Sequence, residues 1–563
     1  MSARIPEPGV HRALIDDLLY EQQLLTPVAR FSRKHEQNEL PAQAKYYRDL
    51  VPLSSPRHGE QYAFAVDLDA CTGCKACVTA CHNLNGLDDE ETWRDVGALF
   101  GGTLLEPIQQ SVTTACHHCA DPACLNGCPV KAYDKDPVTC DISMTSASAA
   151  NIVSGNVHTT CTKYSKKRGI VRKCDMCSSR LAVGEAPACV QACPNEAIRI
   201  TIVDKQQFAR DWEGKVGFLP GAPDPDYTGP TTQYRTSKNL AGKVLPGDFF
   251  KSKPEHWHPP LILMLVLTQL SVGTLGTDTI LRLLLFPAEL MRTLTPFHSL
   301  VALLLGFLAL GLSTLHLGRP LYAWRAVVGW RTSWLSREII VFGLFVTLAL
   351  IHTASSWLPG ISRLMSRAPF GGLPSPALEN VLGIGATLTG LAGVYCSTMI
   401  YRDTRRMFWR TRMTTPKFFG TTLLLGPATI LFTMTAQSVL VPDILAQLAF
   451  HHVTSLLCQF LVVAMTAKLL WELAVFGHLS DGMGTNMRRT ALLMSGELKS
   501  ATIARFVCGA LGGIVLPVLA LSGSSLPAIG AGILTLSLLR ELLERYLFFA
   551  AVVPSKMPGG IAS

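Results

Sequence analysis

The stretch Cys71-Thr72-Gly73-Cys74-Lys75-Ala76-Cys77-Val78-Thr79-Ala80-Cys81 decides the fold of the N-terminal part of the chain. Its spacing is C-x2-C-x2-C-x3-C. Three thiolates with this spacing hold three corners of a cubane [4Fe-4S] cluster, while the fourth cysteine ligates the other cluster of a two-cluster unit. A zinc site uses pairs of cysteines instead, so zinc is the weaker alternative.

Two further cysteine sets follow, each ending in Cys-Pro. Their members are Cys116, Cys119, Cys124 and Cys128, and then Cys174, Cys177, Cys189 and Cys193. Because the fourth thiolate is exchanged, Cys193 can complete the Cys71 triplet, and Cys81 can complete the last set. Cys116, Cys119 and Cys124 then hold a third cluster with an incomplete shell, as [3Fe-4S] or by recruiting Cys140 or Cys161, and Cys128 is left without a cluster.

The composition separates this head from the rest of the chain. The 563 residues are 48% hydrophobic and only 16% charged, which excludes a single soluble globule. Fourteen of the 17 cysteines lie between Cys71 and Cys193 in tight groups, which argues against a disulfide scaffold. The net charge of +9 comes without a basic arm or zinc-finger spacing, so no nucleic-acid partner is indicated.

Four segments are expected along the chain. Residues 1–60 form an N-terminal helical arm, which either binds a partner or packs on its own domain. No signal-peptide pattern is visible in it. Residues 61–205 form the iron-sulfur domain, residues 206–257 a Pro- and Gly-rich linker, and residues 258–563 a membrane anchor.

The anchor segment contains long stretches without Asp, Glu, Lys or Arg. They are Pro259 to Thr277, Pro296 to Gly318, Ile339 to Gly360, Val381 to Tyr401, Phe418 to Pro442, Ile444 to Ala467 and Phe506 to Leu539. A helix needs about 20 residues to cross ~30 Å of hydrocarbon, and Ser522 to Ser525 divides the last stretch in two. The sequence thus predicts an α+β head followed by an all-α bundle of eight transmembrane helices. Buried helices of a large soluble protein are the alternative.

The order of the cysteine motifs, with Lys173-Cys174-Asp175-Met176-Cys177 in the last, resembles the four-cluster ferredoxin subunit of dimethyl-sulfoxide-reductase-type molybdoenzymes. The resemblance implies a head built as a two-cluster-ferredoxin repeat. In that family another C-x2-C-x2-C-x3-C-P motif stands just before Lys-Cys-Asp. Here the corresponding stretch, Cys140 to Thr162, has only Cys140 and Cys161.

A double frameshift is one explanation for the missing motif. Codons that could encode this stretch can also be read in a shifted frame, in which the third base of each codon is followed by the first two bases of the next. In that frame they can give four cysteines at the expected spacing, followed by proline. The four junctions are Ser146/Ala147, Ala149/Ala150, Ile152/Val153 and Asn156/Val157. Compensating shifts near Thr139 and Thr162 would then restore a four-cluster head. The alternative is a genuine divergent loop, with two clusters fully ligated and a third incomplete.

Three stretches of the anchor also resemble a family protein, the integral anchor subunit of dimethyl sulfoxide reductases. They are Leu315 to Pro320, Trp334 to Glu338 and Arg540 to Phe549. That anchor is usually a separate eight-helix chain, so the resemblance implies a fusion of two subunits.

Ionisable groups at helix ends suit quinol oxidation, which releases two protons with two electrons. We expect His316 to hydrogen-bond the quinol, Glu338 to accept or conduct its proton, and Arg319 to lie one turn from His316. The alternative is a capping or snorkelling role at the interface. A haem b site at His352 or at His451-His452 would need histidines on facing helices, and the family resemblance argues against it.

Positive charge gathers in the loops on the head side of the predicted spans. Its members are Arg319, Arg325, Arg331, Arg337, Arg402, Arg405, Arg406, Arg410, Arg412, Lys417, Arg488, Arg489 and Lys499. The opposite loops hold only Arg282, Arg292, Arg363 and Arg367. The positive-inside rule places the protein in the cell inner membrane with a cytoplasmic head. The arginines can instead be docking sites, if a partner is exported folded together with the head.

The expected function is that of an electron-transfer and anchor subunit. It oxidises menaquinol or ubiquinol and passes electrons through [4Fe-4S] clusters to a separate molybdopterin-containing catalytic chain in anaerobic respiration. The chain is not itself the reductase, because 563 residues filled by head and anchor leave no room for a pterin-binding domain. The alternative is a redox-sensing or ion-translocating membrane protein. That function would call for acidic residues within the spans, and the uncharged stretches have none.

Overall fold

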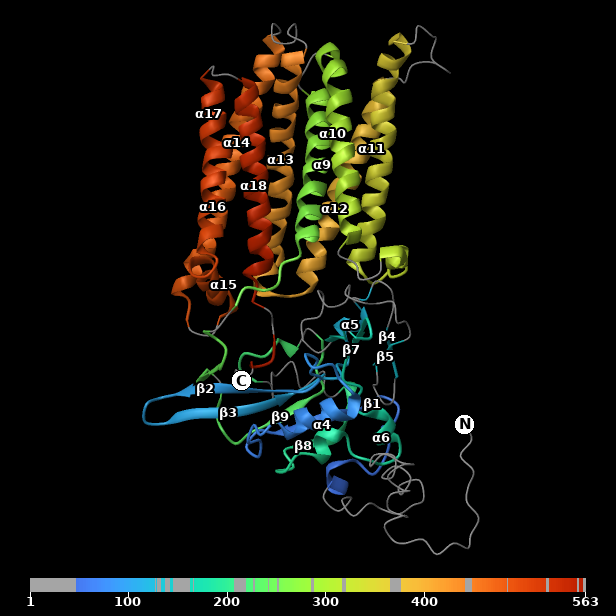
Figure 1. Ribbon diagram of the computed structural model, residues 1–563, viewed down its shortest axis with the longest axis vertical. Coiled ribbons are helices and arrows are strands. Elements are labelled where there is room, and N and C mark those ends of the chain that lie inside the picture. Colours follow the sequence, from blue (N-terminus) through green and yellow to red (C-terminus); the bar gives the residue numbers. More distant parts are fainter. Residues whose placement is uncertain are drawn as a thin grey trace, which may run out of the picture.

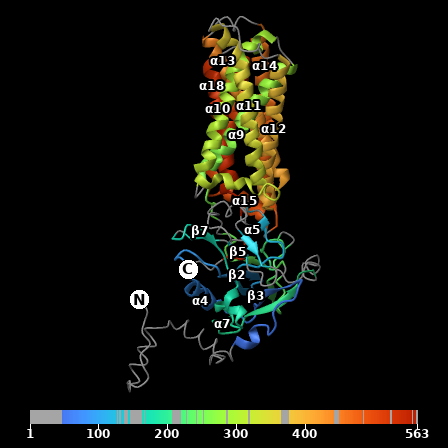
Figure 2. The same ribbon diagram turned by 90° about the vertical axis from the view of Figure 1, so that its right-hand side faces the viewer.

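The structure is a computed structural model. It describes residues 47–126, 128, 133–136, 142–144, 163–165, 167–206, 219–225, 228–240, 242–250, 253–284, 288–315, 320–364, 376–440, 448–482, 485–522, 526–553 and 556–559. Most of the predicted N-terminal arm, residues 1–46, lies outside this range. A mixed α and β head lies at one end of a bundle of long helices, as Figures 1 and 2 show from two sides.

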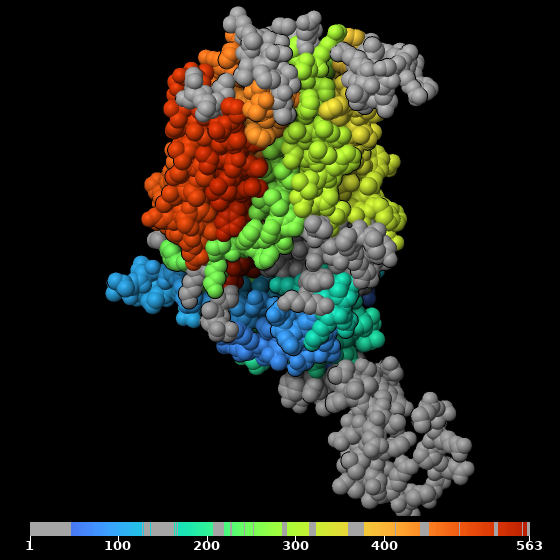
Figure 3. Space-filling view, turned by 45° about the horizontal axis from the view of Figure 1, so that its top comes forward, coloured from blue at the N-terminus to red at the C-terminus, as the bar shows by residue number. Residues whose placement is uncertain are grey.

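Two three-stranded sheets organise the head. In the first, β1 (Glu60–Asp67) pairs antiparallel with β8 (Ile198–Asp204), which brings the first and last cysteine motifs together. In the second, β2 (Asp95–Gly102) and β3 (Pro107–Thr114) form a hairpin that projects sideways from the head in Figure 3. Short elements carry the motifs between the strands: α4 (Ala76–Asn85), α5 (Ala123–Asn126), β4 (Tyr133–Lys135), β5 (Ile142–Met144), β6 (Lys163–Ser165), β7 (Ile170–Arg172), α6 (Ser178–Ala182) and α7 (Ala188–Gln191).

The segment predicted as a linker contributes a strand to each sheet. Strand β9 (Gln233–Arg235) runs parallel to β1, and β10 (Val244–Pro246) runs antiparallel to β2. Tyr234 and Val244 are buried in the head core. Proline and glycine punctuate this segment without preventing short edge strands, so its described part packs on the head and does not run freely between two domains.

The anchor consists of long helices joined by short connections. They are α9 (Pro259–Leu284), α10 (Ala288–Leu315), α11 (Trp334–Leu364), α12 (Pro376–Asp403), α13 (Thr411–Leu440), α14 (Leu448–Leu473), α16 (Lys499–Ala510), α17 (Leu516–Leu521) and α18 (Leu526–Ala550). A π-helical turn, Leu511–Val515, joins α16 to α17 into one long helix. The short helix α15 (Asn486–Ser495) lies at the head end.

These helices form two groups. We call α9 to α12 the first bundle, and α13, α14, α16–α17 and α18 the second bundle. Helix α9 packs against α13 and joins the groups. There the backbones approach closely, because a Cβ on Gly273 would come within 2.2 Å of the Thr422 carbonyl oxygen, and one on Gly426 within 2.3 Å of the Gly273 oxygen. Small residues allow membrane helices to pack in this way.

Seven helices among the described residues are long and apolar enough to cross a membrane. The chain is therefore an integral membrane protein. Helix α18 is as long as the others, but four charged residues in its second half distinguish it from them. The helices also extend beyond the uncharged stretches, so that acidic residues such as Asp278, Glu338, Glu472 and Glu541 lie inside them.

Head and anchor meet through two connections. The Arg489 side chain donates to the Asp248 carbonyl oxygen at 3.1 Å, beside the chain segment that enters α9. After α18 the chain returns to the head, where Met557 joins the head core and the Gly559 carbonyl oxygen accepts from the Ala98 amide at 3.2 Å. The C-terminal end in Figure 1 accordingly lies within the head.

Candidate functional site

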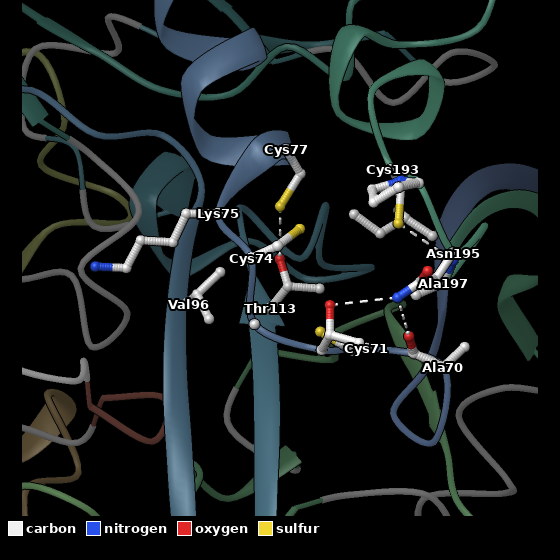
Figure 4. A pocket seen from close by; sticks show the side chains of 14 residues that line it. Ala70, Cys71, Cys74, Lys75, Cys77, Val96, Thr113, Cys193, Asn195 and Ala197 are labelled. Atoms are coloured by element: carbon white, nitrogen blue, oxygen red, sulfur yellow. Dashed lines mark hydrogen bonds between the residues drawn. The ribbon is translucent and has the colours of Figure 1, made fainter.

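The first cysteine pocket lies between α4, β3 and the turn after α7 (Figure 4). It is lined by Cys71, Cys74, Cys77 and Cys193. The Ala197 amide donates to the Cys193 sulfur at 3.3 Å, and the Thr113 hydroxyl lies 3.5 Å from the Cys77 sulfur. The structure thus groups these four residues as the predicted thiolate exchange requires.

The second cysteine pocket lies one turn further along α4. It is lined by Cys81, Cys174, Cys177 and Cys189. The Met176 amide donates to the Cys174 sulfur at 3.4 Å, which is the kind of amide contact that stabilises a thiolate. Helix α4 therefore presents Cys77 to one pocket and Cys81, one turn later, to the other.

Cysteines of the middle set, all four of which are described, form a third group. Cys116, Cys119 and Cys124 lie close enough to interact electrostatically. The Lys173 ammonium donates to the Cys116 sulfur at 3.7 Å and to the Cys174 carbonyl oxygen at 3.1 Å, so it bridges this group and the second pocket. Cys128 is buried. The proposed substitutes Cys140 and Cys161, and all four frameshift junctions, lie outside the described residues.

The chemistry of the pockets fits a cluster better than a single ion. All twelve motif cysteines are free of disulfides. Among the residues that the structure describes, no three His, Cys, Asp or Glu side chains converge closely enough to hold one metal ion. The cysteines instead surround a space, as four thiolates around a cubane must.

Burial makes these thiols weak acids until a metal binds. It raises the pKa of Cys81 to about 12, with a further contribution from Cys189, and burial likewise raises the pKa of Cys177 to about 12. Thiolates are the ligands of iron-sulfur clusters. Iron would supply the positive charge that favours the ionised form of these thiols.

The cysteine loops adopt a backbone conformation that most residues avoid. Lys75, His118 and Met176 each lie between motif cysteines and have positive φ values of 64°, 45° and 61°. Gly73 has a φ of 76°, and a Cβ there would come within 2.7 Å of the Ser111 hydroxyl oxygen. Such conformations cost roughly 1–3 kcal/mol each for non-glycine residues and gather at functional sites.

The predicted quinol residues are only partly described. His316 and Arg319 lie outside the described residues. Glu338 lies near the end of α11 that faces the head and is 3% exposed. The Ser397 hydroxyl of α12 donates a hydrogen bond to its carboxylate. Ionisable groups buried in a membrane bundle are rare, which makes Glu338 a candidate functional residue.

The candidate haem histidines lie in different surroundings. His352 is buried, and a Cβ on Gly383 of α12 would come within 3.4 Å of its ring. His451 and His452 are exposed in the first turns of α14, in the other bundle.

Sequence reasoning missed a buried pair in the half of the first bundle away from the head. The His298 ring nitrogen Nδ1 lies 2.7 Å from the Asp278 carboxylate, and Thr295 donates to the same oxygen at 3.2 Å. Asp278 and His298 are both fully buried. The sequence signal was weak: Asp278 stands directly after the first uncharged stretch, and His298 lies near the start of the second.

A larger network of charged side chains is buried at the head end of the second bundle. It consists of Lys417, Lys468, Glu472, Arg505, Arg540, Glu541, Glu544 and Arg545, all at most 7% exposed. Lys468 and Glu541 are 2.7 Å apart, Arg540 and Glu472 are 2.6 Å apart, and Arg545 donates to Gln269 of α9 at 2.8 Å. Lys417, which the sequence suggested as a loop charge, is part of this network.

Comparison with known proteins identifies both parts of the chain. Residues 255–549, more than half of the sequence, match the family described as DMSO reductase anchor subunit (DmsC), and residues 109–203 match the 4Fe-4S dicluster domain. The head is similar to a chain of the anaerobic dimethyl sulfoxide reductase of Haemophilus influenzae, with 31% identity over 181 residues, 29% of this chain and 83% of that protein.

Two other relatives show the range of the similarity. The corresponding anaerobic dimethyl sulfoxide reductase protein of Escherichia coli K12 is 29% identical over 191 residues, covering 32% of this chain and 90% of the relative. A subunit of the sulfite dehydrogenase of Allochromatium vinosum is 40% identical over 131 residues, 23% of this chain and 38% of that protein. The chain belongs to the DMSO reductase anchor subunit family and carries, ahead of that anchor, an iron-sulfur head of the kind found in dimethyl sulfoxide reductases.

Proposed function

We propose that this chain oxidises membrane quinol and passes the electrons through [4Fe-4S] clusters to a separate molybdopterin-containing reductase chain. The observation that carries the proposal is the pair of four-cysteine pockets at one end of a membrane bundle that holds a buried carboxylate near the same end. When bound, the clusters supply one-electron carriers. The anchor would take electrons from quinol, and the head would pass them to the reductase chain.

The cluster ligands are assigned by pocket. Cys71, Cys74, Cys77 and Cys193 would hold one cluster, and the second pocket another. Cys116, Cys119 and Cys124 would hold a third, complete only if residues 140–162 supply the missing fourth ligand, and Cys128 would be left without a cluster in the chain as written. Lys173 supports this count, because it joins the third group to the second pocket.

At the quinol site, protein groups would handle the two protons. His316 would hydrogen-bond a quinol hydroxyl, with Arg319 beside it, and Glu338 would accept the proton, helped by the hydroxyl of Ser397. Each quinol yields two electrons and two protons, so the electrons leave through the head while the protons leave through such side chains.

A quinol-reduction assay tests this function. In purified full-length protein, His316→Ala and Glu338→Gln should slow reduction of the clusters by a quinol analogue at least tenfold, while dithionite should reduce them as in the wild type. Glu379→Gln is the matched control, because Glu379 lies in the first turn of α12 at the far end of the same bundle. Equal losses with both reductants, or no loss with quinol, would contradict the assignment.

The topology proposed for the anchor has eight spans. Helix α18, 25 residues long, would be the eighth, because its four charged residues are buried inside the bundle and do not face lipid. The head would face the cytoplasm, since Arg325 and Arg331 lie in the connection next to it and Arg337 lies in the first turn of α11. Protease digestion of right-side-out vesicles tests the orientation: a head that is cleaved from outside would reverse it.

The reductase partner is proposed from the family. Two of the relatives of the head are named as chains of dimethyl sulfoxide reductase, and this chain would bind a catalytic chain of that type. Co-expression with an adjacent gene for a molybdopterin protein, followed by affinity purification of this chain, should yield a complex that contains molybdenum. If the chain purifies without molybdenum although quinol reduces its clusters, the proposed reductase partner is wrong.

An ion-translocating role is the second candidate. The observation that favours it is the buried Asp278–His298 pair, which supplies the acidic group inside the bundle that the uncharged stretches lacked. In proteoliposomes, such a protein would acidify or alkalinise the lumen during quinol oxidation, and Asp278→Asn would abolish this pH change. Quinol oxidation without transport beyond the scalar protons would exclude it.

A further inference from the structure

Arg94 lies between the two complete cysteine pockets. It stands directly before β2 and is only 2% exposed. Its side chain forms part of the wall of the second pocket, beside Cys81, Cys174 and Cys189. An arginine buried to this extent in a small domain needs a compensating negative charge.

The same guanidinium also reaches the first pocket. Its Nη1 donates to the Thr113 hydroxyl at 3.2 Å, and that hydroxyl lies 3.5 Å from the Cys77 sulfur. Thr113 lines the first pocket, as Figure 4 shows. One side chain therefore contacts the second pocket directly and the first through a single hydroxyl.

No described carboxylate neutralises Arg94. Glu91, three residues before it, is paired with Arg172 and accepts a hydrogen bond from the Trp93 indole at 2.8 Å. Arg94 lies over the Phe64 ring at 4.6 Å from its centroid, and within the described part of the chain its Nη2 has no hydrogen-bond partner. Asp175 lines the same pocket without an ion pair to Arg94, so the cysteines, once ionised on iron, would supply the negative charge beside the guanidinium.

The electrostatics agree with this geometry. Burial alone would lower the pKa of Arg94, but the charges of Cys189, Cys77, Cys174 and Cys81 together raise it above its usual range. These cysteines belong to both pockets. An arginine side chain keeps its charge over the pH range in which proteins are normally folded, so the guanidinium is a fixed positive charge.

We propose that Arg94 is a positioning residue that raises the reduction potentials of both clusters by acting as their shared counter-charge. This inference rests on the proposed function. Each reduction adds one electron to a cluster and no proton, because the cation stays charged before and after. A fixed positive charge in a poorly screened interior stabilises the reduced form, and protein charge near a cluster is one of the levers that set its potential.

The test is an EPR-monitored redox titration of the full-length protein. Replacement Arg94→Gln should shift the equilibrium of both clusters at least tenfold toward the oxidised form, which is about 59 mV for a one-electron couple. Arg94→Lys keeps a charge on a shorter side chain and should shift both in the same direction by less. Arg199→Gln is the matched control, since Arg199 is exposed on β8 and its charge is screened by water.

The outcomes separate this inference from the proposed function. If the wild-type chain contains no iron, the proposed function fails. If both clusters are present and Arg94→Gln titrates like the wild type, or shifts only one cluster, the shared counter-charge is wrong and the function stands. Should Arg94→Gln lose its iron, Arg94→Lys decides: two lowered potentials support the inference, and two unchanged potentials overturn it.

Discussion

The head and the second bundle both bury ionisable side chains, but they compensate them differently. In the second bundle, five cations and three carboxylates lie against one another at the head end of the helices. In the head, eight thiols surround two pockets, and Arg94 is the cation that reaches both. The charged side chains of the bundle network form ion pairs with one another. The head pockets are instead lined by thiols, which are ligands suited to iron.

The difference shows which buried groups belong to a binding site and which to the architecture. Burying a charge costs several kcal/mol unless a partner is present, so each region must be neutralised in some way. In the bundle, Lys468 of α14 and Glu541 of α18 form an ion pair. The thiols of the second pocket share one cation, Arg94, with the first, and burial keeps the Cys81 thiol protonated. Removing a ligand should therefore cost the head a cofactor, and removing a charge should cost the bundle stability.

The largest effect concerns the incomplete third group. If the double frameshift is real, the DNA reads TGC or TGT across Ser146/Ala147, Ala149/Ala150, Ile152/Val153 and Asn156/Val157. A protein made from the corrected frame should then bind about sixteen iron atoms, against about eight for two full clusters in the chain as written. Iron assay after anaerobic purification measures the difference.

The bases themselves can refute this. Any other base at one of the four third positions excludes a simple double shift and leaves a genuine loop. Iron near zero in both proteins would remove the cluster assignment altogether, and zinc in place of iron would replace it.

The next effect is the loss of a single cluster. Cys74→Ser and Cys193→Ser should abolish the same EPR signal and about four iron atoms, because both residues line the first pocket although 119 positions separate them in sequence. Cys81→Ser should abolish the other signal. Cys458→Ser, a buried cysteine of α14, serves as the control and should change neither.

The pattern of losses is what matters here. If Cys193→Ser removed the signal that Cys81→Ser removes, the ligands would not be exchanged between motifs. A spectrum unchanged by Cys74→Ser would mean that Cys74 is not a ligand.

The bundle network should respond through stability instead. Glu541→Gln leaves Lys468 without its carboxylate and Arg540 with Glu472 alone, and breaking a buried pair in this way costs roughly 3–5 kcal/mol. We expect a lower midpoint of thermal unfolding in detergent, with unchanged EPR signals. The exposed Glu497→Gln, next to α16, is the control. Lost cluster signals at wild-type stability would show that the network serves electron transfer.

The smallest effect is a pH dependence of the iron-free protein. The folded pKa of Cys81 and Cys177 is raised to about 12, so their neutral form favours folding at low pH, and that stability is lost as the pH rises from about 9 toward 12. Each such thiol contributes at most about 1.4 kcal/mol per pH unit in that window.

Urea unfolding of the iron-free chain should therefore have a lower midpoint at pH 10 than at pH 8. The iron-loaded chain should change less, because its thiols are already ionised on iron. An equal loss in both forms would attribute the effect to other groups, and no loss in the iron-free form would mean that the thiols are not buried.

Much of this architecture was predictable because it rests on local spacing. The C-x2-C-x2-C-x3-C stretch and the later Cys-Pro motifs predicted which cysteines lie together, and the structure places Cys193 in one pocket with Cys71 and Cys81 in another with Cys189. Their role as cluster ligands stays a prediction. Hydrophobic length likewise predicted long helices in the places where the structure has them. Ligand spacing and hydrophobic length are properties of neighbouring residues, so one sequence suffices to read them.

The tertiary structure decided what depends on distant partners. Arg94 is an ordinary arginine in sequence, and only the pairing of β2 and β3 brings it to Thr113 and so to Cys77. The charged residues of α18 lie in its second half, and only the tertiary structure shows that Glu541 pairs with Lys468 of α14 inside the bundle. A buried charge is defined by its surroundings, and folding assembles those surroundings from segments that lie far apart in the chain.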